Sequence, residues 1–222
     1  MIKINRFEKE LKNKDFRVSI FGSARIKKGD QHYKQVYELA KFLALDGIDL
    51  VTGGGPGLME AASHGHKEGK KISGIKSHTI GLGIKLPKAQ MFNQSITIRK
   101  KSDKFSTRLD DFMILSNVVV VASGGVGTIL ELFYTWQLMQ VNHICNIPII
   151  LLGDMWYDLI KWLKKYPLKK KFFERKDLDL LFVAKNCDEA MGIIRLAHDD
   201  FKHNRKNVCL NYKKYKKYYD GY

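Results

Sequence analysis

Four consecutive valines begin residues 118–136, VVVVASGGVGTILELFYTW, and lead into a glycine-rich turn. A continuous apolar run of this kind is typical of a strand that is buried on both faces, as in a parallel sheet covered by helices. The glycines of 124–128 let the backbone turn sharply, and an acid, Glu131, follows. The stretch therefore predicts a buried strand, a glycine hinge and one carboxylate on the first turn of a helix.

Similar apolar runs alternate with helical patterns along the whole chain. The expected strand segments are 16–23, 48–55, 71–76, 95–100, 117–123, 147–153 and 180–186. The expected helices are 32–47, 56–69, 102–116, a helix from the glycine turn to about residue 140, 155–166 and 188–203, and residues 77–93 are expected to form a long irregular loop. Two details are expected at helix starts, namely Pro56 at the first helical position and Ser102 as an N-cap. Alternation of strands and helices predicts an α/β fold, a Rossmann-like doubly wound parallel sheet in a single domain.

The chain has 222 residues and a formal net charge of +16. We expect an N-terminal extension at 1–15, a Rossmann-like domain at 16–204 and a basic tail rich in tyrosine and lysine at 205–222. Much of the positive charge lies at 164–176 and at 213–222, away from the glycine turns. A lysine-rich surface explains this charge most simply, and an anionic partner, either a nucleic acid or a phosphorylated small molecule, is the alternative.

Compartment and metal content can also be predicted from the residue pattern. The first 16 residues contain no apolar signal-like segment. The chain has no run of 18 or more apolar residues, the length that a membrane-spanning helix needs. The three cysteines include no CxxC pair, which favours a cytoplasmic protein without a zinc knuckle. His64 and His66 would point about 200° apart on a helix, so we expect no metal site.

Three glycine-marked turns follow strands at the same edge of the expected sheet. Carboxyl ends of parallel strands meet there, and α/β sheets bind ligands beyond them. A helix N-terminus after such a turn favours phosphate, and a turn without any ligand is the alternative. The predicted binding residues are Gly22, Ser23, Gly53, Gly54, Gly55, Gly57, Met59, Gly124, Gly125, Val126, Gly127 and Thr128. No GKS or GKT sequence follows the glycines and the first turn lacks GxGxxG, so a mononucleotide fits better than a triphosphate or a dinucleotide.

Glu131 lies one helical turn beyond Thr128 and is expected to face the same crevice. A carboxylate beside a phosphate is electrostatically unfavourable, which suggests a catalytic purpose. Cleavage at a sugar carbon passes through an oxocarbenium-like state that a carboxylate stabilises. A solvated glutamate that complements the helix dipole is the alternative.

Several motifs together resemble the LONELY GUY family of phosphoribohydrolases, which are often labelled lysine decarboxylases. GGVGTILE resembles the family's PGGxGTxxE signature, GGGPGLMEAA its GGGxxGLMG turn, FGSAR its first-strand FxGS turn, and GLGIKLPKAQMFN a loop of its longer bacterial members. This resemblance covers about residues 17–154. It implies hydrolysis of the N-glycosidic bond of a nucleoside 5′-monophosphate, AMP or N6-modified AMP, by a homodimer or higher oligomer without any cofactor.

The resemblance assigns roles to two residues. Glu131 matches the family's catalytic glutamate, and Arg108 matches the arginine of an RK pair, which we expect to bind phosphate or the base because a guanidinium does not readily release a proton. Leu109, Ser123 and Leu130 depart from the family pattern. The departures at Leu109 and Leu130 bear on base preference and rate more than on the reaction class, whereas Ser123 is expected only to loosen the turn.

Two rival functions come from other classes. A nucleotide or cofactor carrier could use the same fold without catalysis, although a carrier has no need of Arg108 and Glu131 together. A nucleic-acid-binding protein would use the net charge and the basic tail, and we favour it less. Lysine decarboxylation would require a Schiff-base lysine, for which no local sequence argues.

Overall fold

The strands form one parallel sheet in a computed structural model that describes residues 7, 8, 10, 15–87 and 91–203. Within these residues the sheet has seven strands in the order β4-β3-β2-β1-β5-β6-β7, and every neighbouring pair is parallel. The strands are β1 (Arg17–Phe21), β2 (Asp49–Thr52), β3 (Thr79–Ile84), β4 (Ile98–Ser102), β5 (Val118–Val121), β6 (Ile149–Leu152) and β7 (Leu181–Ala184). The helices are α2 (Gln31–Leu45), α3 (Leu58–Ser73), α4 (Phe105–Leu115), α5 (Val126–Gln140), α6 (Met155–Leu163), the π-helix η1 (Lys164–Leu168), α7 (Arg175–Leu178) and α8 (Cys187–His203). The predicted α/β, Rossmann-like fold is therefore confirmed.

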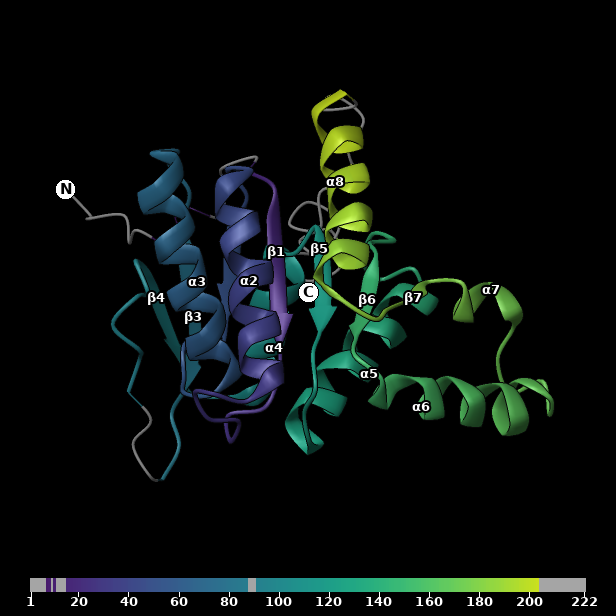
Figure 1. Ribbon diagram of the computed structural model, residues 1–222. Helices are drawn as coiled ribbons and strands as arrows, with labels where there is room; N and C mark the ends of the chain where they lie inside the picture. The colour runs from purple at the N-terminus through teal and green to yellow at the C-terminus, as the bar shows by residue number, and fades with distance from the viewer. Residues whose placement is uncertain (1–6, 9, 11–14, 88–90, 204–222) are drawn as a thin grey trace.

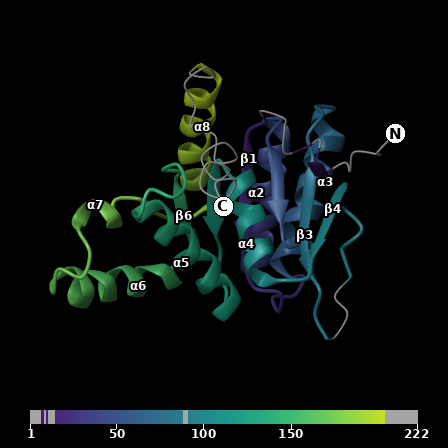
Figure 2. The same cartoon turned by 180° about the vertical axis from the view of Figure 1, so that it is seen from behind.

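Two hydrophobic cores sandwich the sheet, one on each face. Val118 and Val120 pack in the core under α2, α3 and α8, whereas Val119 and Val121 pack in the core under α4, α5 and α6. Successive residues of a strand point to opposite faces, so a strand covered on both sides must be apolar throughout. Figures 1 and 2 show α2 and α3 on one face of the sheet and α4 on the other.

The strand order reverses at β1. One half of the chain runs outward through β2, β3 and β4, and the other half runs outward through β5, β6 and β7. Loops that follow β1 and β5 therefore diverge and leave a crevice at their carboxyl ends. The backbone N–H of Ser23 donates to the carbonyl of Ser123 at 3.0 Å and joins the two loops at the base of this crevice.

Residues 71–76 and 77–93 were wrongly predicted. The expected strand at 71–76 instead ends α3, which stops at Gly74 in the left-handed region at φ 67°. β3 lies within the expected irregular loop, and its pattern TIGLGI hides a buried strand behind two glycines. A Cβ at Gly83 would lie 2.7 Å from the Phe92 ring, so glycine makes room for that ring on the sheet.

Two helix starts also differ from the predictions. α3 begins at Leu58 rather than at Pro56, because Gly57, at φ 68°, is its N-cap. Ser102 is not an N-cap. It ends β4 and its hydroxyl donates to Asp111 Oδ2 at 3.4 Å, while Lys104 takes the N-cap position of α4.

Two predictions concern the ends of the chain, namely the N-terminal extension at 1–15 and the basic tail at 205–222. Phe7 is buried in the core beside α4, and the proposed boundary at residue 15 remains a prediction. The expected basic tail at 205–222 lies outside the described residues. In the part of the chain that the structure describes, no helix combines the length and apolar character that a membrane span requires.

Candidate functional site

A cavity of about 470 Å³ lies at the carboxyl ends of β1 and β5, where the strand order reverses. Figure 1 shows the arrowheads of both strands at this edge. The predicted residues that line the cavity are Gly22, Ser23, Gly53, Met59, Arg108, Gly125, Val126, Gly127, Thr128 and Glu131. The three glycine turns thus do converge on one crevice.

The N-terminus of α5 forms an open wall of this cavity. Gly125 is the N-cap, and no atom lies within 4 Å of a Cβ built at Gly125 or Gly127. A Cβ at Gly124, by contrast, would lie 2.1 Å from Thr128 Oγ1, so the threonine side chain packs directly over that glycine. The N–H groups of a first helical turn have no partner within the helix, and this wall is therefore suited to an anion.

Glu131 lies further along α5 than the open N-terminus, in the second turn of the helix rather than in the first as expected. Its side chain is buried, with the residue only 9% exposed. Burial raises the pKa of its carboxyl above the ordinary 4.5, because water no longer solvates the charge, and the nearby Arg108 guanidinium partly offsets that rise. A buried acid with a perturbed pKa in a cleft is a typical feature of functional sites.

Arg108 holds that carboxylate. Its Nη1 donates to Glu131 Oε1 at 3.0 Å, and its Nε donates to the carbonyl of Leu82 at 2.7 Å. The guanidinium carbon also lies 5.0 Å from the centroid of the Phe112 ring. The guanidinium is thus fixed by α5, β3 and α4 together, and its visible role is to orient Glu131. Direct binding of phosphate or base by Arg108 stays a prediction.

Gly53 leaves space for this arrangement. A Cβ there would lie 2.5 Å from Arg108 Nη2 and 2.6 Å from Met59 Sδ. The glycine at the end of β2 therefore lets the guanidinium and the thioether approach the backbone. Its role concerns the shape of the site at least as much as ligand contact.

The remaining predicted glycines do not line the cavity. Gly54 and Gly55 border a smaller neighbouring pocket beside Phe92, and Asn93 Nδ2 donates to both of their carbonyls at 3.1 and 3.2 Å. Gly57 is required by the backbone, because a Cβ at its φ of 68° would lie 2.4 Å from the Ser23 carbonyl oxygen. These glycines, like Gly124, shape the turns around the cavity.

Sequence reasoning missed several residues at the site. Ala24, Arg25 and Ile84 line the cavity. Arg25 also borders an open basin that continues toward Lys27 and Lys28. The basic run SARIKKG, which begins at the first glycine turn, could have indicated that positively charged side chains border the site.

The three departures from the family motif have different surroundings. Leu109 is buried in the core, whereas Leu130 is 46% exposed on α5. Ser123 is buried, and its Oγ lies 3.1 Å from His32 Nδ1. At Ser123 the chain therefore makes a side-chain hydrogen bond that a proline could not make.

Structural comparison finds several solved proteins with this fold. The molybdenum cofactor binding protein from the phototrophic bacterium Rippkaea orientalis superposes with a TM-score of 0.62, covering 82% of this chain and 96% of that chain at 21% identity. The molybdenum cofactor carrier protein MCP from Chlamydomonas reinhardtii gives a TM-score of 0.58, covering 83% and 99% at 22% identity. The protein TM1055 gives 0.58, covering 82% and 99% at 23% identity. At these identities the likeness shows a shared fold alone.

Sequence comparison is more specific. A search of curated proteins finds no significant match. Residues 59–194, more than half of the chain, match the family model described as "Possible lysine decarboxylase". The chain therefore belongs to the LONELY GUY family, whose domain carries that description.

Proposed function

We propose that the protein hydrolyses the N-glycosidic bond of a nucleoside 5′-monophosphate, AMP or N6-modified AMP, to a free base and ribose 5-phosphate. One observation carries this proposal: the buried Glu131 carboxylate lies in the same cavity as an open helix N-terminus and is held there by Arg108. A carrier of an anionic ligand would gain nothing from a buried carboxylate in its binding cavity. An enzyme that stabilises a sugar cation needs one.

The cradle and the acid have matching positions. Glu131 follows Thr128 by three residues, a rise of about 4.5 Å along the α5 axis, which is comparable to the size of a ribose ring. A 5′-phosphate at the N-terminus of α5 would thus place the sugar beside the carboxylate. The phosphate supplies binding energy that orients the glycosidic bond.

The proposed reaction uses Glu131 in its ionised form. As the bond to the base breaks, positive charge develops on the anomeric carbon and ring oxygen, and the carboxylate stabilises it. Water then adds to the sugar carbon, and the departing base takes up a proton. Arg108 favours the ionised acid, because its positive charge opposes the effect of burial on the pKa of Glu131.

The name of the family model suggests decarboxylation instead. That reaction would need a lysine in the cavity to form a Schiff base with a pyridoxal group. Among the described residues that line the cavity there is no lysine. The arrangement therefore supports glycosidic hydrolysis better than lysine decarboxylation.

Homo-oligomerisation and a cytoplasmic location are part of this proposal. Val126, which lines the cavity, is 87% exposed, and Leu130, about one turn further along α5, is 46% exposed. Apolar side chains exposed together on a helix are typical of an interface, which fits the expected homodimer. Sedimentation at several concentrations would measure the assembly directly.

A carrier function is the second candidate, because two of the similar structures are named as molybdenum cofactor binding or carrier proteins. A carrier would retain its ligand unchanged. The cavity and the α5 N-terminus would serve it equally well, whereas the pairing of Arg108 with Glu131 would have no purpose in it.

Incubation with a panel of nucleoside 5′-monophosphates, followed by chromatography of the free base, tests the proposal. We expect base release from at least one monophosphate, at a far higher rate than from the matching nucleoside, since the phosphate cradle contributes to catalysis. Equal rates on AMP and adenosine would contradict the cradle. Absence of base release, together with tight retention of the molybdenum cofactor, would favour the carrier.

A further inference from the structure

The segment from α6 to α7 extends sideways beyond the β7 edge of the sheet, so its outer end lies away from the carboxyl ends of β1 and β5 (Figure 1). A cleft of about 290 Å³ lies between this segment and α5. We name it the aromatic cleft, after most of its lining: Phe133, Trp136, Trp162, Phe172 and Phe173, with Gln137, Gln140, Leu163 and Pro167. The proposed hydrolysis uses none of these residues.

The floor of the cleft is held by a hydrogen bond and a ring contact, and its rim is exposed. Trp136 Nε1 donates to the Asp177 carbonyl at 2.7 Å, and the Trp136 ring packs edge-on against Phe173. On the rim, Trp162 is 51% exposed and Phe172 is 76% exposed. Large apolar rings that gather at a hollow in contact with water indicate a binding surface.

Polar groups of the cleft can recognise a planar heterocycle. The Gln137 and Gln140 side chains both line it. An amide offers donors and an acceptor that match the edge of a nucleobase. Gln140 is oriented by a hydrogen bond from its Nε2 to Asp177 Oδ2 at 3.1 Å.

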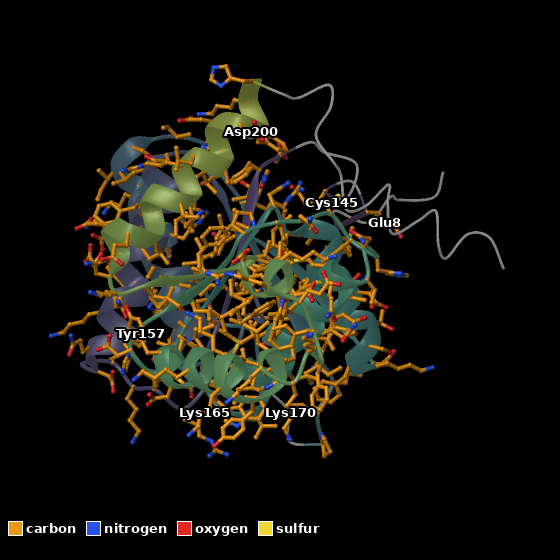
Figure 3. The ribbon with its side chains drawn as sticks, turned by 90° about the vertical axis from the view of Figure 1, so that its right-hand side faces the viewer. Glu8, Cys145, Tyr157, Lys165, Lys170 and Asp200 are labelled. Carbon is orange, nitrogen blue, oxygen red and sulfur yellow. The ribbon has the colours of Figure 1, made fainter. Side chains whose placement is uncertain are left out.

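Positive charge is concentrated on the same segment. Five of the eight residues from 164 to 171 are exposed lysines, namely Lys164, Lys165, Lys169, Lys170 and Lys171. None of the five forms an ion pair with a residue that the structure describes. Figure 3 shows Lys165 and Lys170 at the outer edge of the molecule. The backbone that carries them is unusual, since η1 is a π-helix with Pro167 inside it, and Lys171 has a φ of 57°. π-Helical turns are rare and frequently occur at functional sites.

We propose that the aromatic cleft and these lysines bind single-stranded nucleic acid. Unpaired bases stack on exposed aromatic rings without sequence preference, while a positively charged groove follows the backbone. The cleft volume suits one unstacked base, and the neighbouring lysines would contact the adjoining phosphates. A duplex would keep its bases paired and out of the cleft.

Charge and shape distinguish this occupant from two others. A second copy docking through the same face would bring two lysine-rich segments together, which repel each other. A membrane surface would suit rings that project from a convex face, whereas here they line a hollow. A flexible polyanion with planar rings satisfies both the lysines and the aromatic side chains.

Fluorescence anisotropy of the full chain with labelled 12-mer oligo(dT) and oligo(U) tests the proposal, with a duplex of equal length as the comparison. We expect tighter binding of the single strands. Phe172→Ala should weaken it about 5- to 150-fold, the range for one base stacked on an aromatic ring. Leu196→Ala, at a 74% exposed apolar residue of α8, is the matched control and should leave binding unchanged.

The lysines are tested by charge-matched variants. Replacing Lys165, Lys169 and Lys170 by Gln should lower the slope of log affinity against log salt by about 2, at roughly 0.7 for each phosphate contact. The control replaces Lys34, Lys67 and Lys71, exposed on α2 and α3, and should lower it less. Tryptophan fluorescence should also be quenched by the single strand, and a Trp162→Phe variant should lose part of that quenching, because Trp136 also lines the cleft.

Three results would overturn the proposal. Binding that all cleft variants retain at full strength would place the nucleic acid elsewhere on the chain. Sedimentation with anionic lipid vesicles but no affinity for oligonucleotides would assign the surface to a membrane. A change of oligomeric state in Phe172→Ala without any change in oligonucleotide binding would assign it to a second copy.

Discussion

At the scale of single residues, the site combines a buried carboxyl group, that of Glu131, with a neighbouring positive charge, that of Arg108. Burial raises the pKa of Glu131, and the guanidinium of Arg108 partly offsets that rise. The 3.0 Å bond between Nη1 and Oε1 therefore has an electrostatic as well as a positioning effect. The same bond explains why the guanidinium of Arg108 is oriented toward the acid.

Replacing Arg108 should change the pH dependence of catalysis. Without the guanidinium the pKa of Glu131 rises further, so the acid limb of kcat/KM in Arg108→Gln should move to higher pH. Breaking a buried charge pair costs about 2–5 kcal/mol, which predicts a large loss of rate at neutral pH. Arg108→Lys should recover only part of it, because an ammonium cannot copy the fork of a guanidinium.

Steady-state kinetics of both variants between about pH 5 and 9 on the best monophosphate measure this effect. An unchanged acid limb and a kcat/KM within threefold of the wild type would mean that Arg108 does not act on Glu131.

At the scale of elements, the strand-to-helix turns determine what can enter the site. Gly53 directly follows β2, and the side chains of Arg108 and Met59 lie close to its backbone. Both contacts involve the far ends of flexible side chains. A methyl group at this position can therefore be accommodated by the fold, although not by the site.

Gly53→Ala should fold but lose activity. The added Cβ would lie only 2.5 Å from Arg108 Nη2, so the guanidinium must move and its hydrogen bond to Glu131 weakens. We expect kcat to fall at least tenfold while the free energy of unfolding, measured with urea, changes by no more than about 1 kcal/mol. Gly192→Ala on α8, where no atom lies within 4 Å of the added Cβ, is the control. Retention of full kcat in Gly53→Ala would show that Arg108 tolerates displacement.

A second element-scale feature fastens α3 to the sheet. His66 is fully buried, its Nε2 lies 2.9 Å from the Ile48 carbonyl and its Nδ1 lies 2.8 Å from Thr79 Oγ1. A carbonyl only accepts, so Nε2 carries a hydrogen. Burial lowers the pKa of His66 to about 3. This histidine therefore joins α3 to the residue that precedes β2 and to β3.

Stability should fall in acid because of His66. Its pKa is lower in the folded than in the unfolded chain, so its contribution is complete above about pH 6.5 and is lost as the pH falls toward 3. The loss is about 1.4 kcal/mol per pH unit, or about 2 kcal/mol between pH 7 and 5. Urea unfolding at both values should show a smaller difference for His66→Gln than for the wild type, and equal differences would contradict the assignment.

At the scale of the whole molecule, apolar patterning predicted the fold because a sheet covered on both faces leaves little choice of residue. The valines of β5 illustrate this, since alternate residues enter opposite cores. The strand at residues 79–84 was not predicted, because Gly81 and Gly83 are typical of loops. In the structure the Phe92 ring packs over both glycines. Their conformation depends on a side chain about ten residues away, which no local pattern records.

The candidate site was predictable to a similar extent. Glycine turns and motif matches predicted most of the cavity lining, because parallel strands bring their ends to one edge. The bond between Arg108 and Glu131 could not be predicted, since the two residues meet only when α4 and α5 pack together. Arg25 was missed because it belongs to a loop whose path the sequence does not fix.

Comparing substrate binding with turnover in Glu131→Gln tests the proposed function most directly. The amide has nearly the same shape as the acid but carries no charge. We expect nucleotide affinity, measured by calorimetry, to stay within a fewfold of the wild type, and base release to fall by at least 1000-fold, about 4 kcal/mol of transition-state stabilisation. Base release by Glu131→Gln at the rate of the wild type would contradict the assignment of Glu131 as the catalytic carboxylate.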